Sequence, residues 1–373
     1  MKRVVFVISA ILMVASLAAA RSVAERVDSL MQTRYNVDEP GAAVLIMKGD
    51  SVLVERYYGI ADMETRCPIT DTTTFNIASI SKQFTVVGAL MLQQQGILDV
   101  NTPVGDFYPE FTADFWKIVT LKHLASQSSG IPDSRDRSSR ERMIYANDSV
   151  SMSYFPQVKE LLFAPGEYYD YVNPTFLLIA DVIEKITGKN FVDYQQEMIF
   201  DKSGMMSTYY FNPDVTPLCQ SHGYVPDSNG KWHEKDYGEE TFFATRPDGG
   251  IYSTVKDLAR WEQALEANAI LNDSLLELAY TPVVSVTDSH LCDYQRRPNT
   301  YYAMGWFVDK TSGFPTKVYH TGDNGGYQAY LAKYPSENLF IAVLENRNDK
   351  DRWSMALEID RILKECGALL GGD

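Results

Sequence analysis

Strand-like segments lie at both ends of this chain, and mostly helical segments lie between them. Residues 42–47 and 52–58, joined by Lys48-Gly49-Asp50-Ser51, have the pattern of an antiparallel hairpin. Strand-like patterns return late in the chain, at residues 302–308, 317–320, 327–334 and 339–344. These segments predict an α/β (α+β) fold, in which an antiparallel sheet flanked by helices is built from both chain ends and a mainly helical lobe is inserted between them.

Helical patterns complete this division of the chain. The predicted helices cover residues 22–35, 121–125, 176–186, 191–199, 258–265 and 353–363, and a further buried helix runs from Ser79 to about Gly96. We expect one domain over residues 21–373, with an α/β lobe at about 21–110 plus 300–373 and a helical lobe at about 111–299. Sites usually form in the cleft between two such lobes.

The first twenty residues have the layout of a secretory signal. Lys2 and Arg3 precede an apolar run, which ends in Ala18-Ala19-Ala20. Small residues after a short apolar run suit a signal peptidase. We therefore expect residues 1–20 to be a signal peptide and the protein to be periplasmic or secreted. An uncleaved anchor is the alternative, and no later segment is apolar enough to span a membrane.

Charge and composition exclude several classes of partner. The net charge of −15 argues against nucleic acid and anionic membranes. A hydrophobic content of 45% is enough for a large core, so disorder is not expected. The cysteines are widely spaced and form no C-x-x-C pair, so we expect buried thiols or a single bridge and assign no pairing: Cys67, Cys219, Cys292 and Cys366.

Ser79 opens the buried helix as part of Ser79-Ile80-Ser81-Lys82. The free N–H groups and the dipole at a helix N-terminus favour an anion there. Lys82 falls on the same face, one turn deeper, where desolvation lowers the pKa of an ammonium and makes it a proton acceptor for the Ser79 hydroxyl. The alternative is a capping serine followed by a lysine that extends to solvent.

Two further S-x-x-K copies have simpler explanations. Ser228 lies in Asp-Ser-Asn-Gly, which is typical of a tight turn. Ser253 precedes the predicted helix 258–265, and capping of that helix explains it.

Other short segments place the Ser79 motif in a family. Downstream lie Tyr171-Val172-Asn173 and His320-Thr321-Gly322. Further matching segments lie in the same order at residues 58–62, 75–82, 123–132, 165–167 and 249–254. Together they resemble the serine β-lactamase-like hydrolases, which include class C β-lactamases, penicillin-binding proteins, D-aminopeptidases and esterases. The resemblance implies the β-lactamase/transpeptidase-like fold.

The resemblance also implies catalytic roles. Ser79 would be the nucleophile of an acyl-enzyme, and Lys82 and Tyr171 would share the general acid and base roles. The sequence does not decide which of the two takes the first proton. A tyrosine needs a nearby cation such as Lys82 before it can act as a base at neutral pH. Backbone N–H groups of Ser79 and Asp323 would form the oxyanion hole.

The implied substrate-binding residues come from the second and third motifs. Asn173 would bind a substrate amide or orient Lys82. The strand edge beside the substrate would be formed by His320, Thr321, Gly322 and Asp323. Gly322 would allow close approach of the backbone.

His320 departs from the β-lactamase branch, which carries lysine at this position. A neutral imidazole holds a substrate carboxylate less well than an ammonium. We therefore expect a peptidase or esterase that acts on D-amino-acid peptides or small esters. The alternatives are a β-lactamase or DD-carboxypeptidase, or a non-catalytic penicillin- or peptide-binding protein.

No cofactor or metal is expected, because the histidines form no metal-binding motif. The expected partner is a small-molecule or peptide substrate, with cell-wall peptides among the candidates.

Overall fold

The computed structural model describes residues 23–133, 148–212, 220–235, 246–287, 289 and 296–370. The expected signal peptide, residues 1–20, lies outside these ranges, as do Cys219 and Cys292. Among the described residues, neither Cys67 nor Cys366 is part of a disulfide. Among the helices of the described residues, none has the length and apolar character needed to cross a membrane.

The strands confirm a sheet built from both chain ends. Eight strands form one sheet in the order β10-β11-β12-β13-β14-β15-β1-β2, and all neighbours are antiparallel. Its members are β1 (Ala42–Lys48), β2 (Ser51–Tyr58), β10 (Val284–Ser285), β11 (Thr300–Tyr302), β12 (Phe307–Asp309), β13 (Lys317–Asn324), β14 (Tyr327–Tyr334) and β15 (Leu339–Glu345).

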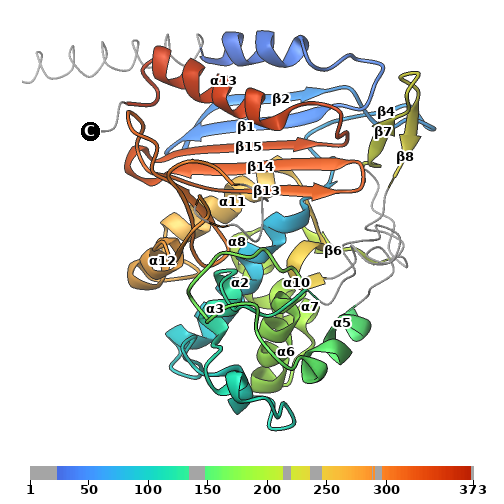
Figure 1. The fold of residues 1–373 in the computed structure, drawn as a ribbon. Coiled ribbons are helices and arrows are strands. Elements are labelled where there is room, and N and C mark those ends of the chain that lie inside the picture. The colour runs from blue at the N-terminus through green and yellow to red at the C-terminus, as the bar shows by residue number, and fades with distance from the viewer. Residues whose placement is uncertain are drawn as a thin grey trace, which may run out of the picture.

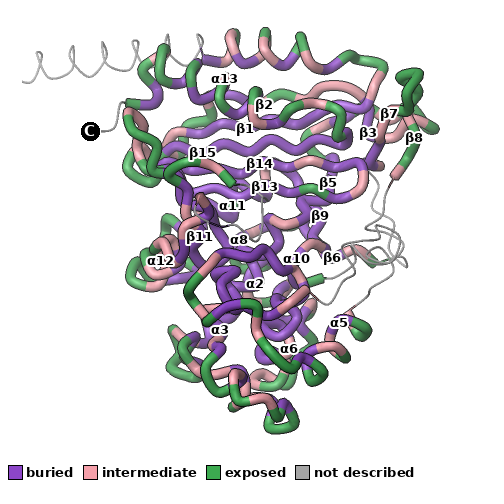
Figure 2. Tube along the Cα trace, viewed as in Figure 1, coloured by how far each residue is buried: buried purple, intermediate pink, exposed green. Residues whose placement is uncertain are grey.

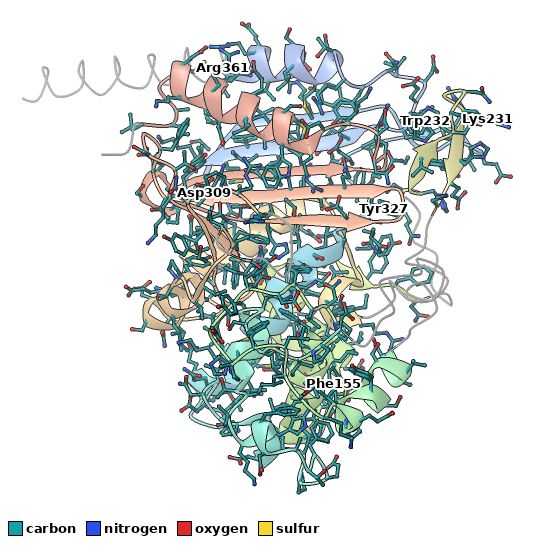
Figure 3. The ribbon with its side chains drawn as sticks, in the orientation of Figure 1. Phe155, Lys231, Trp232, Asp309, Tyr327 and Arg361 are labelled. Carbon is teal, nitrogen blue, oxygen red and sulfur yellow. The ribbon has the colours of Figure 1, made fainter. Side chains whose placement is uncertain are left out.

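Smaller strands lie outside this sheet. They are β3 (Ile60–Asp62), β4 (Cys67–Pro68), β5 (Phe75–Asn76), β6 (Tyr209–Tyr210), β7 (Tyr224–Pro226), β8 (Trp232–Glu234) and β9 (Ile251–Ser253). The β7–β8 hairpin projects past the end of the sheet, with Lys231 in its turn (Figure 3). This hairpin confirms the turn predicted around Ser228.

Most helices lie between β5 and β10 in the chain and below the sheet in Figure 1. They are α2 (Ser81–Gln94), α3 (Leu121–Ala125), α5 (Asp148–Tyr154), α6 (Thr175–Thr187), α7 (Phe191–Gln195), α8 (Asp201–Ser203), α10 (Arg246–Gly249), α11 (Val255–Glu266) and α12 (Asp273–Tyr280). The helix at residues 23–32 and α13 (Arg352–Glu365) cover the opposite face of the sheet (Figure 1).

Both faces of the sheet are buried, as Figure 2 shows for its central strands. Along β1, Val44 and Ile46 pack with the residues of α13, whereas Leu45 and Met47 belong to the core shared with α2 and α11. Alternate residues of a strand point to opposite faces. A central strand covered on both sides therefore reads as continuously apolar, which is what β1 and β15 show.

Two details of the sequence prediction were wrong. Residues 302–308 form two strands, β11 and β12, because the chain turns at Gly305, whose φ is +83°. Residue Thr254, rather than Ser253, caps α11: its hydroxyl accepts a hydrogen bond from Asp257 N at 3.0 Å. The Ser253 hydroxyl instead lies 2.7 Å from that of Thr208.

A buried ion pair joins α11 to the sheet. Lys333 of β14 and Glu262 of α11 form a salt bridge, and their side chains are 8% and 10% exposed. Although burial lowers it, the charge of Glu262 raises the pKa of Lys333 above its ordinary value. The attraction of Glu262 therefore outweighs the cost of burying the Lys333 ammonium.

Glu262→Gln should destabilise the protein by about 3 kcal/mol, because it leaves a buried ammonium without its partner. Urea unfolding at neutral pH measures this loss. The matched control is Glu262→Leu with Lys333→Met, which removes both charges and should recover most of the stability. Equal stability of Glu262→Gln and the parent protein would contradict the role of this pair.

Candidate active site

Ser79 lies in a short 3-10 turn, Ala78–Ile80, which leads into α2. The preceding Ala78 has a φ of +47°, a left-handed conformation that is costly for a residue with a Cβ atom. The side chain of Asn76 holds this turn by accepting a hydrogen bond from Ala78 N at 2.8 Å. Ile77 N also donates to the carbonyl of Ile251 in β9 at 2.9 Å. The strained turn is therefore fixed from two sides.

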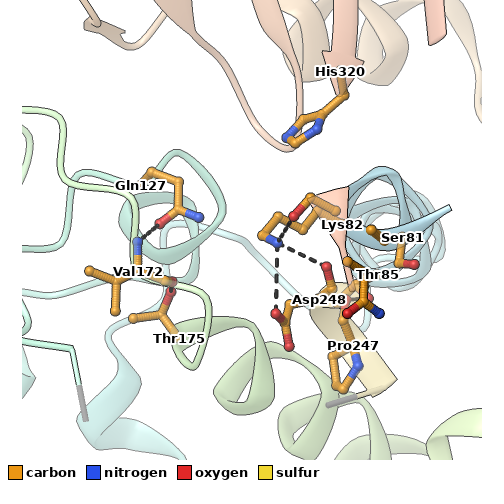
Figure 4. Close-up of polar contacts among 12 residues, drawn as sticks. Ser81, Lys82, Thr85, Gln127, Val172, Thr175, Pro247, Asp248 and His320 are labelled. Carbon is orange, nitrogen blue, oxygen red and sulfur yellow. Dashed lines mark hydrogen bonds and ion pairs between the residues drawn. The ribbon is translucent and has the colours of Figure 1, made fainter. Parts of the chain in front are cut away.

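Lys82 is fully buried, and its ammonium nitrogen lies 3.1 Å from Ser79 Oγ. The same Nζ donates to the main-chain oxygen of Asp248 at 2.8 Å and lies 3.8 Å from the Asp248 carboxylate (Figure 4). The structure thus brings the first two predicted catalytic residues within direct proton-exchange distance.

Tyr171 is 7% exposed and lies beside this pair. Its ring centroid is 4.9 Å from Lys82 Nζ. The residues on both sides of Tyr171 are bound by Gln127: Asp170 N donates to the Gln127 main-chain oxygen at 2.9 Å, and Val172 N donates to its side-chain Oε1 at 2.8 Å (Figure 4). Gln127 therefore fixes the loop that carries the phenol.

Asn173 lies two residues further along the same loop. Its side-chain oxygen is buried and accepts no hydrogen bond from any part of the chain that the structure describes. A buried acceptor without a partner is costly unless a ligand supplies a donor. Asn173 is thus placed to receive a substrate N–H.

Strand β13 brings the third motif against the turn that carries Ser79. Pairing with β12 ends at Tyr319, so the residues that follow pair only with β14. A Cβ atom at Gly322 would lie 2.2 Å from the Ile77 carbonyl oxygen and 3.1 Å from the Ala78 Cβ. Glycine at this position is required for the strand to approach the turn that carries Ser79.

His320 is fully buried, and both ring nitrogens are occupied by protein groups. Nδ1 donates to the Thr321 carbonyl at 2.6 Å, and Nε2 accepts from the Tyr302 hydroxyl at 3.0 Å. Burial, with the positive charge of Lys82 next in effect, lowers the pKa of His320 to about 3. His320 is therefore a neutral part of the buried wall, with its polar atoms engaged by the protein.

Arg352 of α13 holds the end of β13. Its guanidinium binds the two carboxylate oxygens of Asp323 at 3.0 and 2.9 Å and donates to the Gly322 carbonyl at 2.9 Å. The position of Asp323, whose N–H is a predicted oxyanion donor, is set by this bidentate pair.

The sequence analysis missed Gln127, Tyr302 and Asp248. Gln127 lies inside a segment that matches the family pattern and Asp248 lies next to one, but neither residue type by itself indicates a role in the site. Only their contacts show what they hold. Within the described ranges, no group of three or more metal-binding side chains is arranged to hold an ion.

Comparisons with known proteins agree with this architecture. A model of the Beta-lactamase family matches residues 23–363. Penicillin-binding protein 4* of Bacillus subtilis (strain 168) is 26% identical over 351 residues, which cover 89% of this chain and 74% of that protein. Protein flp of Staphylococcus aureus (strain NCTC 8325 / PS 47) is 26% identical, over 83% of this chain and 60% of its own length.

A solved structure shares the fold. The crystal structure of a penicillin-binding protein from Bacillus halodurans superimposes with a TM-score of 0.75 at 25% identity, and covers 90% of this chain and 98% of that one. Because the family model spans most of its length, this chain belongs to the Beta-lactamase family of serine hydrolases.

Proposed function

We propose that this protein is a serine hydrolase that forms an acyl-enzyme on Ser79 and acts as a peptidase or esterase on D-amino-acid peptides or small esters. The observation that carries the proposal is the 3.1 Å separation of Ser79 Oγ and a fully buried Lys82 Nζ. Burial of a lysine costs folding free energy, so stability does not explain its position. A lysine beside a serine at the start of a helix suits activation of a nucleophile.

In this mechanism the Ser79 oxygen bonds to the substrate carbonyl carbon, and its proton passes to the Lys82–Tyr171 pair. The same pair returns the proton to the departing amine or alcohol, which leaves the acyl group on Ser79. A water molecule then repeats the sequence and releases the acid. Main-chain N–H groups of Ser79 and Asp323 would hold the oxyanion, and each such donor contributes on the order of a hundredfold in rate.

The third motif supports the proposed substrate class. His320 is neutral and buried, so it supplies no fixed charge for a substrate carboxylate. The nearby Arg352 is already paired with Asp323. These contacts support a substrate without an essential carboxylate beside β13. β-Lactamase or DD-carboxypeptidase activity is the alternative, and the Bacillus subtilis relative is named as a penicillin-binding protein.

We further propose that the protein is exported to the periplasm or secreted. Lys2, Arg3 and the apolar run up to Ala20 support this proposal.

Trapping of the acyl-enzyme tests the proposed function directly. The purified protein is mixed with p-nitrophenyl esters, D-Ala-D-Ala peptides, nitrocefin and a fluorophosphonate, and intact mass is followed with time. Esters should give a transient mass increase located on Ser79, and Ser79→Ala should give none; turnover confined to the D-Ala-D-Ala peptides would indicate the DD-carboxypeptidase alternative. Stable adducts without turnover would indicate a binding protein, and rapid nitrocefin hydrolysis would indicate a β-lactamase.

Gly322→Ala should lower kcat/KM by about a hundredfold or more, because the added methyl group forces β13 away from Ile77 and disturbs the oxyanion donors. Ester hydrolysis measures this effect, and circular dichroism checks the fold. Gly313→Asn is the matched control, since no atom lies within 4 Å of a Cβ built at Gly313 and asparagine tolerates its φ of +83°. Unchanged kinetics in Gly322→Ala would exclude this placement of the oxyanion hole.

Acid should destabilise the protein through His320. Its folded-state pKa of about 3 lies below the ordinary value of 6.5, so only the unfolded state binds a proton between those values. The free energy of unfolding should therefore fall by about 1.4 kcal/mol for each pH unit lost within that window, and His320→Gln should lack this contribution. Urea unfolding between about pH 6 and pH 4 measures the difference. His233→Gln, which removes an exposed imidazole, is the control. If the free energy of unfolding changed with pH at the same slope in the parent protein, His320→Gln and His233→Gln, a neutral His320 would be refuted.

A further inference from the structure

Two different atoms of Asp248 face the Lys82 ammonium. The main-chain oxygen accepts its hydrogen bond at 2.8 Å, and carboxylate Oδ2 lies 3.8 Å from the same nitrogen (Figure 4). The side chains of Lys82 and Asp248 are 0% and 7% exposed. This is a buried ion pair next to the nucleophile, and solvent does little to weaken it.

Helix α2 itself holds Asp248 in place. The Thr85 hydroxyl donates to the carbonyl of Pro247 at 2.6 Å. Ile251 N donates to the Ser81 hydroxyl at 3.2 Å. Ser81 and Thr85 flank Lys82 along α2, so the helix that carries the lysine also binds the chain on both sides of Asp248. The Lys82–Asp248 geometry is thus built into one local unit.

The charges around the pair favour the ammonium form of Lys82. Burial by itself favours the neutral amine, whereas an opposite charge within about 4–6 Å favours the cation. The carboxylate of Asp248 supplies that charge from α10. Tyr171 faces Lys82 with its ring, and His320 of β13 is neutral.

The groups beyond Asp248 belong to α5 and α10. Burial, followed by the negative charge of Asp248, raises the pKa of Asp148 to about 7, and the positive charge of Arg246 opposes this. Asp148 therefore holds its negative charge less firmly than an ordinary aspartate, and the carboxylate that lies within ion-pair distance of Lys82 is that of Asp248.

We propose that Asp248 is a positioning residue that fixes the location of Lys82 Nζ through its main-chain oxygen and keeps Lys82 in the ammonium form through its carboxylate. This inference rests on the proposed function only in giving Lys82 a catalytic role. An ammonium has no lone pair, so the Ser79 proton would then pass to Tyr171 in its phenolate form, which becomes a phenol, and the charge of Lys82 would act by stabilising that phenolate. Without the carboxylate, the neutral amine itself could accept the proton.

Titration of Lys82 by NMR tests the proposal without relying on turnover. Lysine labelled with ¹³C at Cε is incorporated into the full-length protein, and the Lys82 signal is assigned by its loss in Lys82→Arg. Asp248→Asn removes the negative charge and keeps the main-chain contact. The titration midpoint of Lys82 should fall by about one to three pH units in this variant.

Asp148→Asn is the matched control, because it removes a neighbouring carboxyl that makes no ion pair with Lys82; it should shift the midpoint less than Asp248→Asn does. Asp248→Ala provides a second variant if the asparagine protein folds poorly. An unchanged Lys82 midpoint in folded Asp248→Asn or Asp248→Ala would overturn the proposal. A shifted midpoint in a protein that never acylates Ser79 would refute the proposed function alone.

Discussion

The close approach of β13 to the turn before Ser79 is the contact on which the site depends. Gly322 allows it, because any side chain at that position would strike the Ile77 carbonyl. The same approach places the buried wall of His320 and Tyr302 next to Lys82 and Tyr171. The sheet and the helices therefore meet at the nucleophile, and each side supplies part of the proposed chemistry.

Two buried ion pairs among the described residues serve different ends. Lys333 and Glu262 join the sheet to α11. Lys82 and Asp248 lie beside Ser79, where we propose that the aspartate sets the charge state of the lysine. An ion that is removed from water needs an opposite charge beside it. This requirement ties α11 to the sheet at the first pair, and at the second pair it bears on the proposed reactivity of Ser79.

Much of the architecture was predictable because it depends on local patterns. The strand-like patterns at both chain ends and the helical patterns between them correctly predicted a sheet built from both ends. The hairpin of β1 and β2 and strands β14 and β15 lie close to their predicted positions. The error at residues 302–308 has a local cause as well: an apolar run interrupted by Gly305 reads as one strand, but the glycine reverses the chain. The periodicity of apolar residues alone does not distinguish one long strand from two short strands.

The sequence by itself determined the spacing of Ser79 and Lys82, since residues three apart on a helix share a face whatever surrounds them. It also determined the order of the three motifs. Only the tertiary structure decided what Lys82 touches, because Asp248 lies 166 residues away in the chain and reaches it through the packing of α10 on α2. Such contacts depend on how the helices and the sheet pack together, and no local pattern of residues encodes that packing.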